Sequence, residues 1–440
     1  MVRNPQLLAR AFNAWLAASD MRRARRRHLR YTYGDQWCDL VDDHTGNIVT
    51  ERSLLVKSGR SPQTNNLIRQ LVKTIVGRYR NLADEGAFYD NTPGSVDSRN
   101  RMAELDSRLL EEFVISGCAV QRVCAERRPG GDGVWVDNVD PDAFFVNSYR
   151  DPRGFDIDFI GMLHDMSLPE VINRFAGGSR RRADALRSLY GSSIDENADM
   201  LQPDTPVGVA TPAGIDFYRP RSGRCRVIEV WQLVGRPVTD ASGRLRMDMR
   251  WISTWLAPDG TVLLGEPSPW PHGSHPFVVK MYPLTDGQVH SFVEDVIDQQ
   301  RTINRLVVLI DSMLASSAKG VLLYPVDQIP KGMKFDDVAS MWANPNAVIP
   351  VAGQGREFPR QMVNNSADSG AYQLLNLQMK LFEDISGISD ALLGRNVSAS
   401  TGQALYDAQV RQAAVSLTDL LASFASFTDE RRAKADAILA

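Results

Sequence analysis

Three long apolar patterns with helical spacing lie in the last third of the chain, and they constrain the fold more than any other feature. They cover about residues 289–318, 369–388 and 402–438. Within each, apolar side chains recur every three or four residues, which is the spacing of one helix face. At ~1.5 Å per residue, a helix over 402–438 would be on the order of 50 Å long. Long helices are therefore predicted to dominate this part of the protein.

Two different connections separate these patterns. A compact block at about 320–366 follows the first and contains the strand-like segments GVLLYPV and NAVIPVAG around a short helix near 335–342. A polar join at 390–402 follows the second. Its small and polar residues include Gly394, Arg395, Asn396, Ser398, Ser400, Thr401 and Gly402. The simplest interpretation of the join is a helix end at Gly394 and a new helix start at Ser400 or Thr401.

The first part of the chain begins with three further helical patterns. They cover residues 5–33, starting at a proline, the second half of 59–80, and about 97–116. Asn65 or Asn66 is the candidate cap of the second helix, because asparagine side chains accept hydrogen bonds from the first helical amides.

Strand signals come next. AVQRVCAER and GVWVDNV are split by the turn RPGGDG, and residues 215–284 hold several more strand-like runs. Between them, a short helix in MSLPEVINRF is predicted to begin after Ser167. Residues 177–214 lose all periodicity, which predicts a mobile surface excursion with one short helix near 182–190. Taken together, these patterns predict an α+β fold.

Composition limits the class of protein. With 440 residues, 43% of them hydrophobic, the chain can bury a large core, and its length suggests about three domains. A formal net charge of -3 argues against a protein that coats nucleic acid in bulk. The four cysteines form no CxxC pair, so we expect a reduced intracellular protein without disulfides or a zinc site. No apolar run approaches the ~20 residues of a membrane helix, and we expect no signal peptide.

Six arginines crowd the segment RRARRRHLR near the N-terminus. On a helix, Arg22, Arg26 and Arg30 form one stripe, and Arg23 and Arg27 form its neighbour. The stripe is either a solvated helix face or a basic patch that meets phosphate or an acidic partner. The sequence leaves these two interpretations open.

No pattern in the sequence points to catalysis. The two histidines of HGSH at 272–275 lie among prolines in a loop, without a nearby cysteine or a second histidine pair. Glu294 and Asp298 share a helix face but lack a third metal ligand. The phosphate-binding motif GxxxxGK[ST] is missing, so we expect no ATP hydrolysis by this chain. We predict no catalytic residue, no metal and no cofactor.

Several strings, taken in their order along the chain, resemble portal proteins of tailed bacteriophages, and most closely those of short-tailed phages. YTYGDQW resembles the opening of many such portals, and GRSPQTNNLIRQLVKTIVGRYR resembles the segment that follows it. VDPDAFFVNSYRDPRGFDIDFIGMLHDMSLPEVINRF is similar to their Asp-Pro strand region, and ISGISDALLGRNVSASTGQALYDAQ to the entry of their tunnel loop. The resemblance spans most of residues 30–425. The excursion at 177–214 has no counterpart in it, and an extended C-terminal crown or barrel is not expected.

The resemblance implies a division into named parts. A wing would span 1–286, stem helices 287–319 and 367–389, a clip 320–366, a tunnel loop 390–402, and a long wing or crown helix 403–440. It also implies a dodecameric ring in the virion, at one capsid vertex, assembled in the host cytoplasm. Such a ring conducts double-stranded DNA during packaging and ejection. The implied partners are the packaging ATPase (the terminase large subunit), the major capsid protein and the head-completion or tail adaptor proteins.

The same resemblance assigns candidate residues to each part. Ring packing by the stem is assigned to Ile303, Leu306, Val307, Ile310, Leu375 and Phe382. Contact of the tunnel loop with DNA is assigned to Arg395, Asn396, Ser398, Ser400 and Thr401. Docking of the packaging motor or adaptor on the clip is assigned to Lys331, Lys334, Asp336 and Asp337.

The charges of the predicted stem agree with a passive conduit. Residues 289–319 carry four acidic and three basic side chains, and residues 369–389 carry two acidic and one basic, so each has a net charge of -1. A wall rich in lysine and arginine would hold a duplex by its phosphates, whereas a weakly acidic wall lets it slide. The neutral polar residues of the join are suited to hydrogen bonds with passing phosphates, which carry no sequence information.

Two other classes of function remain as alternatives. One is an enzyme of phage DNA metabolism, such as a nuclease or a terminase-type ATPase, and the missing ATP-binding motif and metal ligands argue against it. The other is a further packaging or head-completion component, such as a head–tail connector, and the length of the chain and its paired stem helices argue against that.

Overall fold

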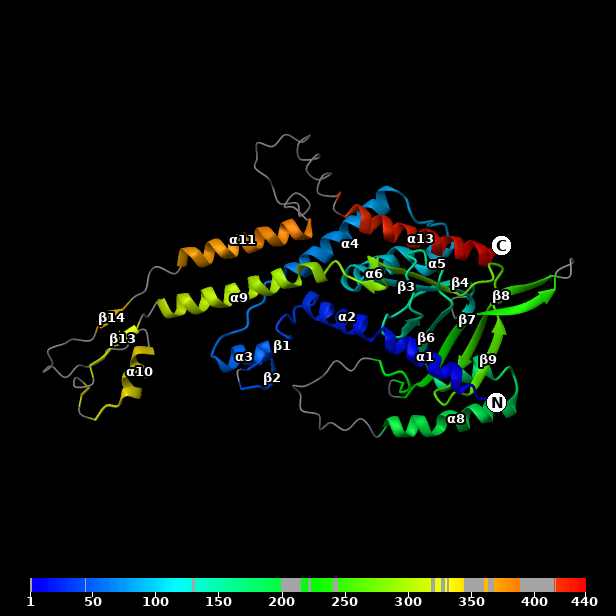
Figure 1. Cartoon of the computed structure of the whole chain (residues 1–440), viewed down its shortest axis with the longest axis horizontal. Helices are drawn as coiled ribbons and strands as arrows, with labels where there is room; N and C mark the ends of the chain where they lie inside the picture. Colours follow the sequence, from blue (N-terminus) through cyan, green and yellow to red (C-terminus); the bar gives the residue numbers. More distant parts are fainter. Residues whose placement is uncertain are drawn as a thin grey trace. The chain divides into compact units, whose positions relative to one another are not determined.

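The structure is a computed structural model that describes most of the chain. The described residues are 2–43, 45–128, 131–198, 215–220, 223–239, 244–317, 321–325, 329–330, 332–343, 360–362, 368–387, 415 and 417–440. Figure 1 shows their helices and strands. They form two compact units. Unit 1 comprises Met1–Tyr33, Ile68–Asp295 and Gly387–Ala440, and unit 2 comprises Gly34–Leu67 and Val296–Ser386.

Two antiparallel sheets form the centre of unit 1. The first has the strand order β10-β3-β4, with β3 at Cys118–Arg128, β4 at Gly131–Asn138 and β10 at Phe277–Met281. The second has the order β5-β6-β7-β8-β9, and its strands are Phe144–Val146, Phe159–Met166, Cys225–Thr239, Leu245–Leu256 and Val262–Pro267. A small two-stranded sheet pairs β11 (Leu284–Thr285) with β12 (Gln288–Val289). The predicted hairpin around RPGGDG and the predicted strand-rich region at 215–284 are confirmed.

The two sheets share one apolar core. Val120 and Phe277 of the first sheet pack in the same cluster as Ile160 and Trp231 of the second. Successive side chains of a strand point to opposite faces of the sheet. The β-branched and aromatic residues of these strands can therefore turn one face of each strand toward this cluster. The core therefore fixes the two sheets to each other within unit 1.

Helices cover both sheets. Helix α1 (Pro5–Ala17) buries Leu7, Leu8 and Ala11 in a cluster with Phe145 and Phe159 of the second sheet. Helix α13 (Thr418–Leu439) packs against β3 and β10. Its Phe424 ring also contacts the rings of Tyr79 and Phe113, which lie on α4 (Leu67–Glu85) and α6 (Met102–Ser116). Thr418–Leu439 confirms the second half of the helix predicted over 402–438, and residues 401–414 lie outside the described part.

The single helix predicted over 5–33 is two helices. Helix α1 ends at Ala17 and α2 spans Ser19–Thr32, with a turn at Ala18 (φ -86°, ψ 12°). The two helices have different packing partners, because α1 lies against β5 and α2 lies against α6. The change of direction follows from these tertiary contacts, and the local sequence carries no break signal.

The helix predicted over 97–116 is also divided. Helix α5 (Val96–Asn100) and α6 are separated by Arg101, which has a left-handed backbone with φ 50°. The Asn100 side chain donates to the Val134 carbonyl at 3.1 Å and accepts from the Val136 amide at 2.9 Å. These bonds attach the end of α5 to strand β4, so the chain leaves the helical path there.

The helix predicted near 182–190 is present and is longer than predicted, but the mobile excursion predicted over 177–214 is wrong for its first half. Helix α8 spans Arg180–Ala198 and buries Ala183, Leu186 and Tyr190 against α7 (Leu168–Phe175) and β7. The Tyr190 hydroxyl donates to the Arg226 carbonyl at 3.0 Å. The apolar positions are few and are separated by arginines, so the periodicity is weak although the packing is tight. Residues 199–214 lie outside the described part.

The start of α7 is as predicted. Ser167 caps the helix, since its hydroxyl accepts from the Glu170 amide while the Glu170 carboxylate accepts from the Ser167 amide. This capping box satisfies two amides that a helix start leaves without a partner.

Unit 2 contains two long helices and the block between them. Helix α9 spans Glu294–Ser317, its first two residues belonging to unit 1, and α11 spans Asp368–Ser386. The block contains β13 (Val321–Leu323), which pairs with β14 (Arg360–Met362), and helix α10 (Phe335–Ala343). These elements confirm the helices predicted over 369–388 and near 335–342. The helix predicted over 289–318 begins only at Glu294, because Val289 pairs with Leu284 in the strands β11 and β12. The predicted strand in NAVIPVAG lies outside the described residues.

A short N-terminal segment completes unit 2. It contains β1 (Leu40–Asp42), β2 (Ile48–Thr50) and α3 (Glu51–Lys57). Among all the helices described in both units, none combines the length and the apolar character that a membrane span requires.

Candidate functional site

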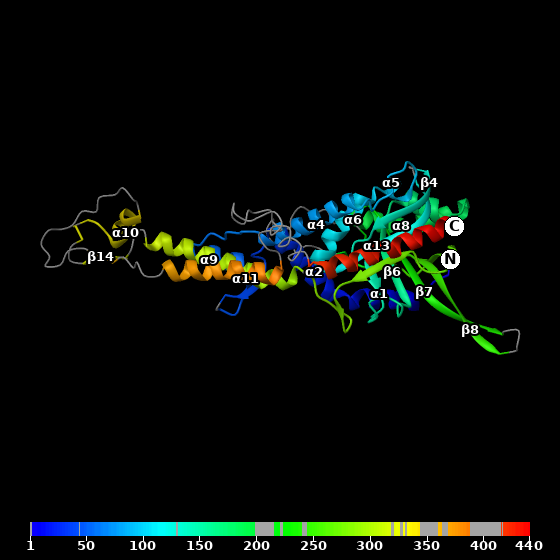
Figure 2. The ribbon, with the colours of Figure 1, turned by 90° about the horizontal axis from the view of Figure 1, so that it is seen from above.

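The candidate site is the helix pair of unit 2. Helices α9 and α11 lie side by side in both views (Figures 1 and 2). The predicted ring-packing residues fall into two groups. Ile303, Leu306, Ile310 and Phe382 are buried within the single chain, whereas Val307 and Leu375 are partly exposed. The buried group therefore stabilises the subunit, and the role of all six residues in ring packing remains a prediction.

Helix α11 carries more apolar surface than the subunit itself covers. Its inward stripe includes Leu375, Phe382 and Ser386, spaced seven and four residues apart. Five further large apolar side chains are 39–51% exposed: Tyr372, Leu374, Leu377, Met379 and Ile385. At ~100° per residue, Tyr372 and Met379 lie on one flank of the stripe and Leu374 and Ile385 on the opposite flank, while Leu377 lies near the far side of the helix. A helix with apolar residues on both flanks is suited to contact with neighbours on two sides.

A cluster of side-chain amides attaches the N-terminal segment of unit 2 to α9. Gln300 accepts from the Leu67 amide at 2.9 Å and donates to the Asn65 carbonyl at 2.7 Å. Asn304 donates to Gln36 Oε1 at 2.6 Å and accepts from the Asn65 amide at 3.1 Å. We call these residues the amide clamp. Because Gln36, Gln300 and Asn304 are almost completely buried, loss of one partner would leave a buried polar group unsatisfied, at a cost of about 1–3 kcal/mol.

The amide clamp explains the string YTYGDQW in structural terms. Gln36 donates to Asn66 Oδ1 at 3.0 Å, and the Trp37 indole donates to the Gln63 carbonyl at 3.1 Å. The first amide of α4 thus bonds with a side chain from α9, and a cap by the side chain of Asn65 or Asn66 stays a prediction. Sequence reasoning missed Gln300 and Asn304. Their signal was present, because two amides four residues apart interrupt the apolar stripe of α9.

The arginines of α9 are held by acidic residues of the same unit. Arg301 pairs with Asp39 and Glu51, both at 3.3 Å, and Arg305 pairs with Glu51 at 2.6 Å. Asp298 and Asp311 on the same helix are exposed. Helix α9 has a net charge of -2, with four acidic and two basic residues, and its two arginines are both paired.

The N-terminus of α9 is capped by Ser291. Its hydroxyl accepts from the Glu294 amide at 3.1 Å and lies 2.9 Å from Nδ1 of the buried His28. Burial lowers the pKa of His28, which favours the neutral ring at this positive end of the helix. The Glu294 carboxylate accepts from the Ser291 amide at 3.4 Å. Glu294 therefore serves as a capping residue here.

The block between the helices places the predicted docking residues at its surface. Lys334, Asp336 and Asp337 are exposed, and Lys331 lies outside the described residues. The Asp337 carboxylate accepts from the Lys334 amide at 2.8 Å, so it also stabilises the start of α10. The predicted DNA-contacting residues of the polar join, Arg395, Asn396, Ser398, Ser400 and Thr401, lie outside the described part.

The arginine-rich segment of α2 fits neither of its two sequence interpretations in full. Arg22 is only 2% exposed and lies over the Trp15 ring at 3.9 Å. Burial lowers its pKa to about 10. Arg25 pairs with Glu112 at 2.7 Å and also with Asp140 and Asp142. Much of the segment therefore holds unit 1 together, while Arg23 stays exposed.

The histidines of HGSH pack against tryptophan rings. His275 lies edge-on to the Trp251 ring at 4.7 Å, and His272 stacks on Trp270 at 5.6 Å. Burial lowers the pKa of both rings, and the partly buried Lys434 adds to the effect. Within the described residues, no three histidine, cysteine, aspartate or glutamate side chains come together as a metal site would require.

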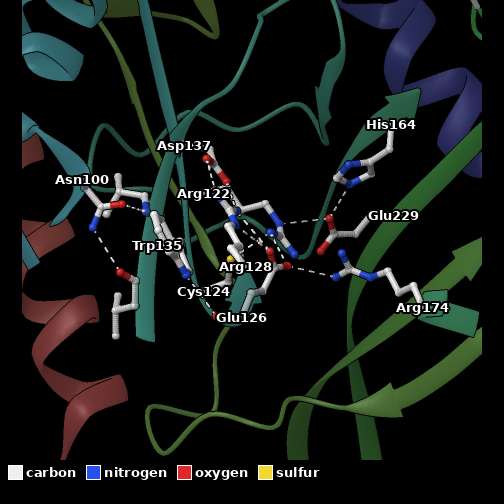
Figure 3. A network of polar contacts seen from close by, with 12 residues as sticks. Asn100, Arg122, Cys124, Glu126, Arg128, Trp135, Asp137, His164, Arg174 and Glu229 are labelled. Carbon is white, nitrogen blue, oxygen red and sulfur yellow. Dashed lines mark hydrogen bonds and ion pairs between the residues drawn. The ribbon is translucent and has the colours of Figure 1, made fainter. Parts of the chain in front are cut away.

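A buried ion network joins the two sheets of unit 1 (Figure 3). Glu229 of β7 has a fully buried side chain and pairs with Arg122 of β3 at 3.2 Å and with His164 of β6 at 2.7 Å. Arg122 also pairs with Glu126 at 3.0 Å, and Arg174 of α7 pairs with Glu126 at 3.1 Å. The network links the first sheet to the second. Each charged group in it lies beside a partner of opposite sign, which offsets the cost of burying that charge.

The network shifts the pKa values of its members. Burial alone would raise the pKa of Glu229, but the Arg122 guanidinium and the His164 and Trp231 hydrogen bonds lower it to about 2. Glu126 is likewise lowered to about 2, mainly by Arg122 and Arg174. Burial lowers the pKa of His164, and Glu229 opposes that shift. Both carboxylates are therefore charged at neutral pH.

Comparison with known proteins addresses the whole chain. The family model described as Phage P22-like portal protein matches residues 95–431, from α5 into α13, which is well over half of the chain. A search of curated proteins found no match.

Proposed function

The chain belongs to the phage P22-like portal proteins, and on this premise we propose that it forms a ring at one capsid vertex of the virion. Double-stranded DNA would pass through the ring during packaging and ejection. A dodecamer is the ring size typical of such portals. The family is structural, and we propose no catalytic role for the chain.

The observation that carries this proposal is the uncovered apolar surface of α11. Five large apolar side chains of one helix, four of them on its two flanks, are partly exposed in the single subunit. Monomeric proteins rarely leave such a continuous apolar surface in water. In a cyclic array, each copy of α11 would have one neighbour on each side, so the flanks would be covered without any other protein.

The charges of α9 support a conduit for DNA. Arg301 and Arg305 are engaged by Asp39 and Glu51, while Asp298 and Asp311 are exposed. In a ring, α9 and α11 would be the stem, and the exposed acidic residues would repeat around it. A duplex carries one charge per ~1.7 Å, so such a wall would repel the phosphates and allow the DNA to slide.

The remaining parts of the proposal follow the named divisions of portals. We propose that 1–286 form the wing, 287–319 and 367–389 the stem, 320–366 the clip, 390–402 the tunnel loop and 403–440 the long helix. The exposed Lys334, Asp336 and Asp337 of the clip, with Lys331, give charges of both signs for docking of the packaging ATPase and later of the adaptor proteins. The major capsid protein would contact the wing.

Imaging of the purified protein tests the ring directly. In negative stain, the protein at micromolar concentration is expected to form rings with a central hole, and light scattering should give one mass that is a whole multiple of the subunit mass. A monodisperse monomer under these conditions would contradict the proposed function.

Deletion of residues 395–400 tests the DNA-contacting role of the tunnel loop. Rings are expected to form normally, because an exposed loop makes few of the contacts that hold a fold together. Packaging into capsids in vitro should fall severalfold in yield of full-length DNA. Arg395→Ala is the matched control and should have a mild effect, because one screened cation contributes little. Wild-type yield from the deletion variant would show that the loop only connects two helices.

A further inference from the structure

A two-stranded ribbon extends beyond the second sheet of unit 1. It is formed by the last residues of β7 and the first residues of β8, residues 235–239 and 245–250, and Figure 2 shows it projecting away from the sheet. Leu245 is 74% exposed, and Val238, Met247 and Met249 are about half exposed. We call this segment the ribbon. Its apolar residues have no cover within the part of unit 1 that the structure describes.

The ribbon has two different faces. Cross-strand pairs share a face, and the pairs Gly235–Met249, Pro237–Met247 and Thr239–Leu245 make one face apolar. The ends of Met247 and Met249 lie over Gly235, where an added Cβ would come within 2.9 Å of the Met247 methyl group. The flexible thioether side chains on this face are suited to packing against another protein surface.

The opposite face of the ribbon is basic. It carries Arg236 opposite Asp248, Arg246 opposite Val238, and Arg250. Arg250 pairs with Asp248 at 2.6 Å. Three arginines against one aspartate leave this face with a net positive charge, so a partner surface should combine apolar contacts with acidic side chains.

Unit 1 has a surface of that kind at the connection between α4 and α5. Residues 84–97 contain four acidic residues, Asp84, Glu85, Asp90 and Asp97, and no lysine or arginine. A cavity of about 390 Å³ opens beside this connection. Its charged lining residues are Asp84, Asp97 and Glu104 against Arg80 and Arg101, which leaves one net negative charge, and Ala83 and Met102 add apolar side chains. Phe88, next in sequence to the lining residue Tyr89, is 45% exposed. We call this the acidic cavity.

The acidic cavity is held in shape before any partner binds. The Tyr89 hydroxyl bonds with Tyr79 at 2.9 Å and donates to the Asp106 carboxylate at 3.1 Å. Arg432 of α13 donates to the Phe88 carbonyl at 2.5 Å. Arg80 in the lining pairs with Glu104 at 2.6 Å, which offsets its charge. A preformed surface loses little conformational entropy on binding.

We propose that the ribbon of one subunit docks into the acidic cavity of the next subunit. The inference rests on the proposed ring and names a contact that would close it. In Figure 2 the ribbon and the connection between α4 and α5 lie on opposite sides of unit 1. Two complementary surfaces on opposite sides of one subunit produce head-to-tail contacts, which generate a closed ring when the rotation between neighbours fits.

Cross-linking between subunits tests this contact. The four natural cysteines are buried, so Leu245→Cys on the ribbon and Phe88→Cys beside the acidic cavity can be linked selectively with a short bismaleimide. The double variant is expected to give a ladder of covalent oligomers that extends beyond the dimer on a denaturing gel. Each single variant should stay monomeric. A ladder that stops at dimers would indicate a two-fold contact and overturn the inference.

The same experiment separates failure of this inference from failure of the proposed function. Rings in negative stain without cross-links would overturn the docking of the ribbon and leave the ring intact. The absence of rings in the untreated wild-type protein would overturn the proposed function and this inference with it.

Charge exchange provides a second measurement. Arg236→Glu with Arg246→Glu should lower the ring yield at least tenfold, with an unchanged circular dichroism spectrum because both side chains are exposed. Asp84→Lys with Glu85→Lys should have the same effect, and all four changes together should restore at least half of the rings. Wild-type ring yield from either reversed pair alone would contradict the inference.

Discussion

Replacing Leu374 with aspartate is expected to remove nearly all rings while leaving the subunit folded. Leu374 is 43% exposed in the single subunit, so its substitution disturbs few contacts within the chain. In the proposed ring, the neighbouring copy covers this flank of α11. A carboxylate there would lose its hydration at every interface around the ring, at a cost of several kcal/mol each. We expect at least a tenfold drop in ring yield by light scattering.

Gln373→Asp is the matched control for this substitution. It adds the same charge to the same helix, but Gln373 is exposed and already polar, so rings should form nearly as in the wild type. Equal loss of rings from both variants would show a general effect of charge on α11. Equal retention would show that the flank of Leu374 is not the interface. Leu306→Asp is a poorer test, because Leu306 is only 8% exposed within the subunit and its loss would also damage the fold.

Glu229→Gln is expected to destabilise unit 1 by about 3 kcal/mol. The change keeps the shape of the side chain but removes the charge opposite Arg122, which is only 5% exposed. A buried arginine that loses a carboxylate partner keeps its desolvation cost and loses the compensating attraction. The measurement is urea unfolding at pH 7, followed by tryptophan fluorescence. Trp231 is a suitable reporter because its indole donates to Glu229 at 2.8 Å.

Asp158→Asn is the control for this prediction. Asp158 pairs with Arg10 at 3.2 Å, but the two side chains are 56% and 50% exposed, so the loss should stay below about 1 kcal/mol. In addition, Arg122→Met combined with Glu229→Gln should cost less than the sum of the two single changes, because the pair is then removed together. Simple additivity would contradict a direct interaction between these charges.

The same substitution should change the pH dependence of stability. The pKa of Glu229 is about 2 in the folded protein against an ordinary 4.5, so its contribution is present above pH 4.5 and is lost as the pH falls toward 2. The pKa of His164 is lowered from 6.5, so its protonation in the unfolded chain also reduces stability as the pH falls below 6.5. Glu229→Gln should flatten the stability curve between pH 5 and 2. A curve parallel to that of the wild type would exclude Glu229 as a source of the slope.

The sequence by itself determined the elements whose signals are local. The Ser167 capping box, the paired strands around RPGGDG and the long helices α9, α11 and α13 were all predicted, and the structure confirms each within its described residues. Capping and helical periodicity involve residues at most four positions apart, so a single sequence contains the whole interaction. The family match at residues 95–431 covers these elements except for the last residues of α13.

Only the tertiary structure decided which polar residues are buried and which apolar residues are left exposed. Arg25 is held by Glu112, which lies 87 positions away, and Asn304 bonds with Gln36 across 268 positions. The turn at Ala18 and the packing of α8 likewise depend on partners from distant strands and helices. A buried charge or amide is stable only when a polar partner lies within bonding distance and in the right orientation. That geometry is set by the packing of the whole unit, so the sequence near Arg25 or Gln300 cannot reveal it.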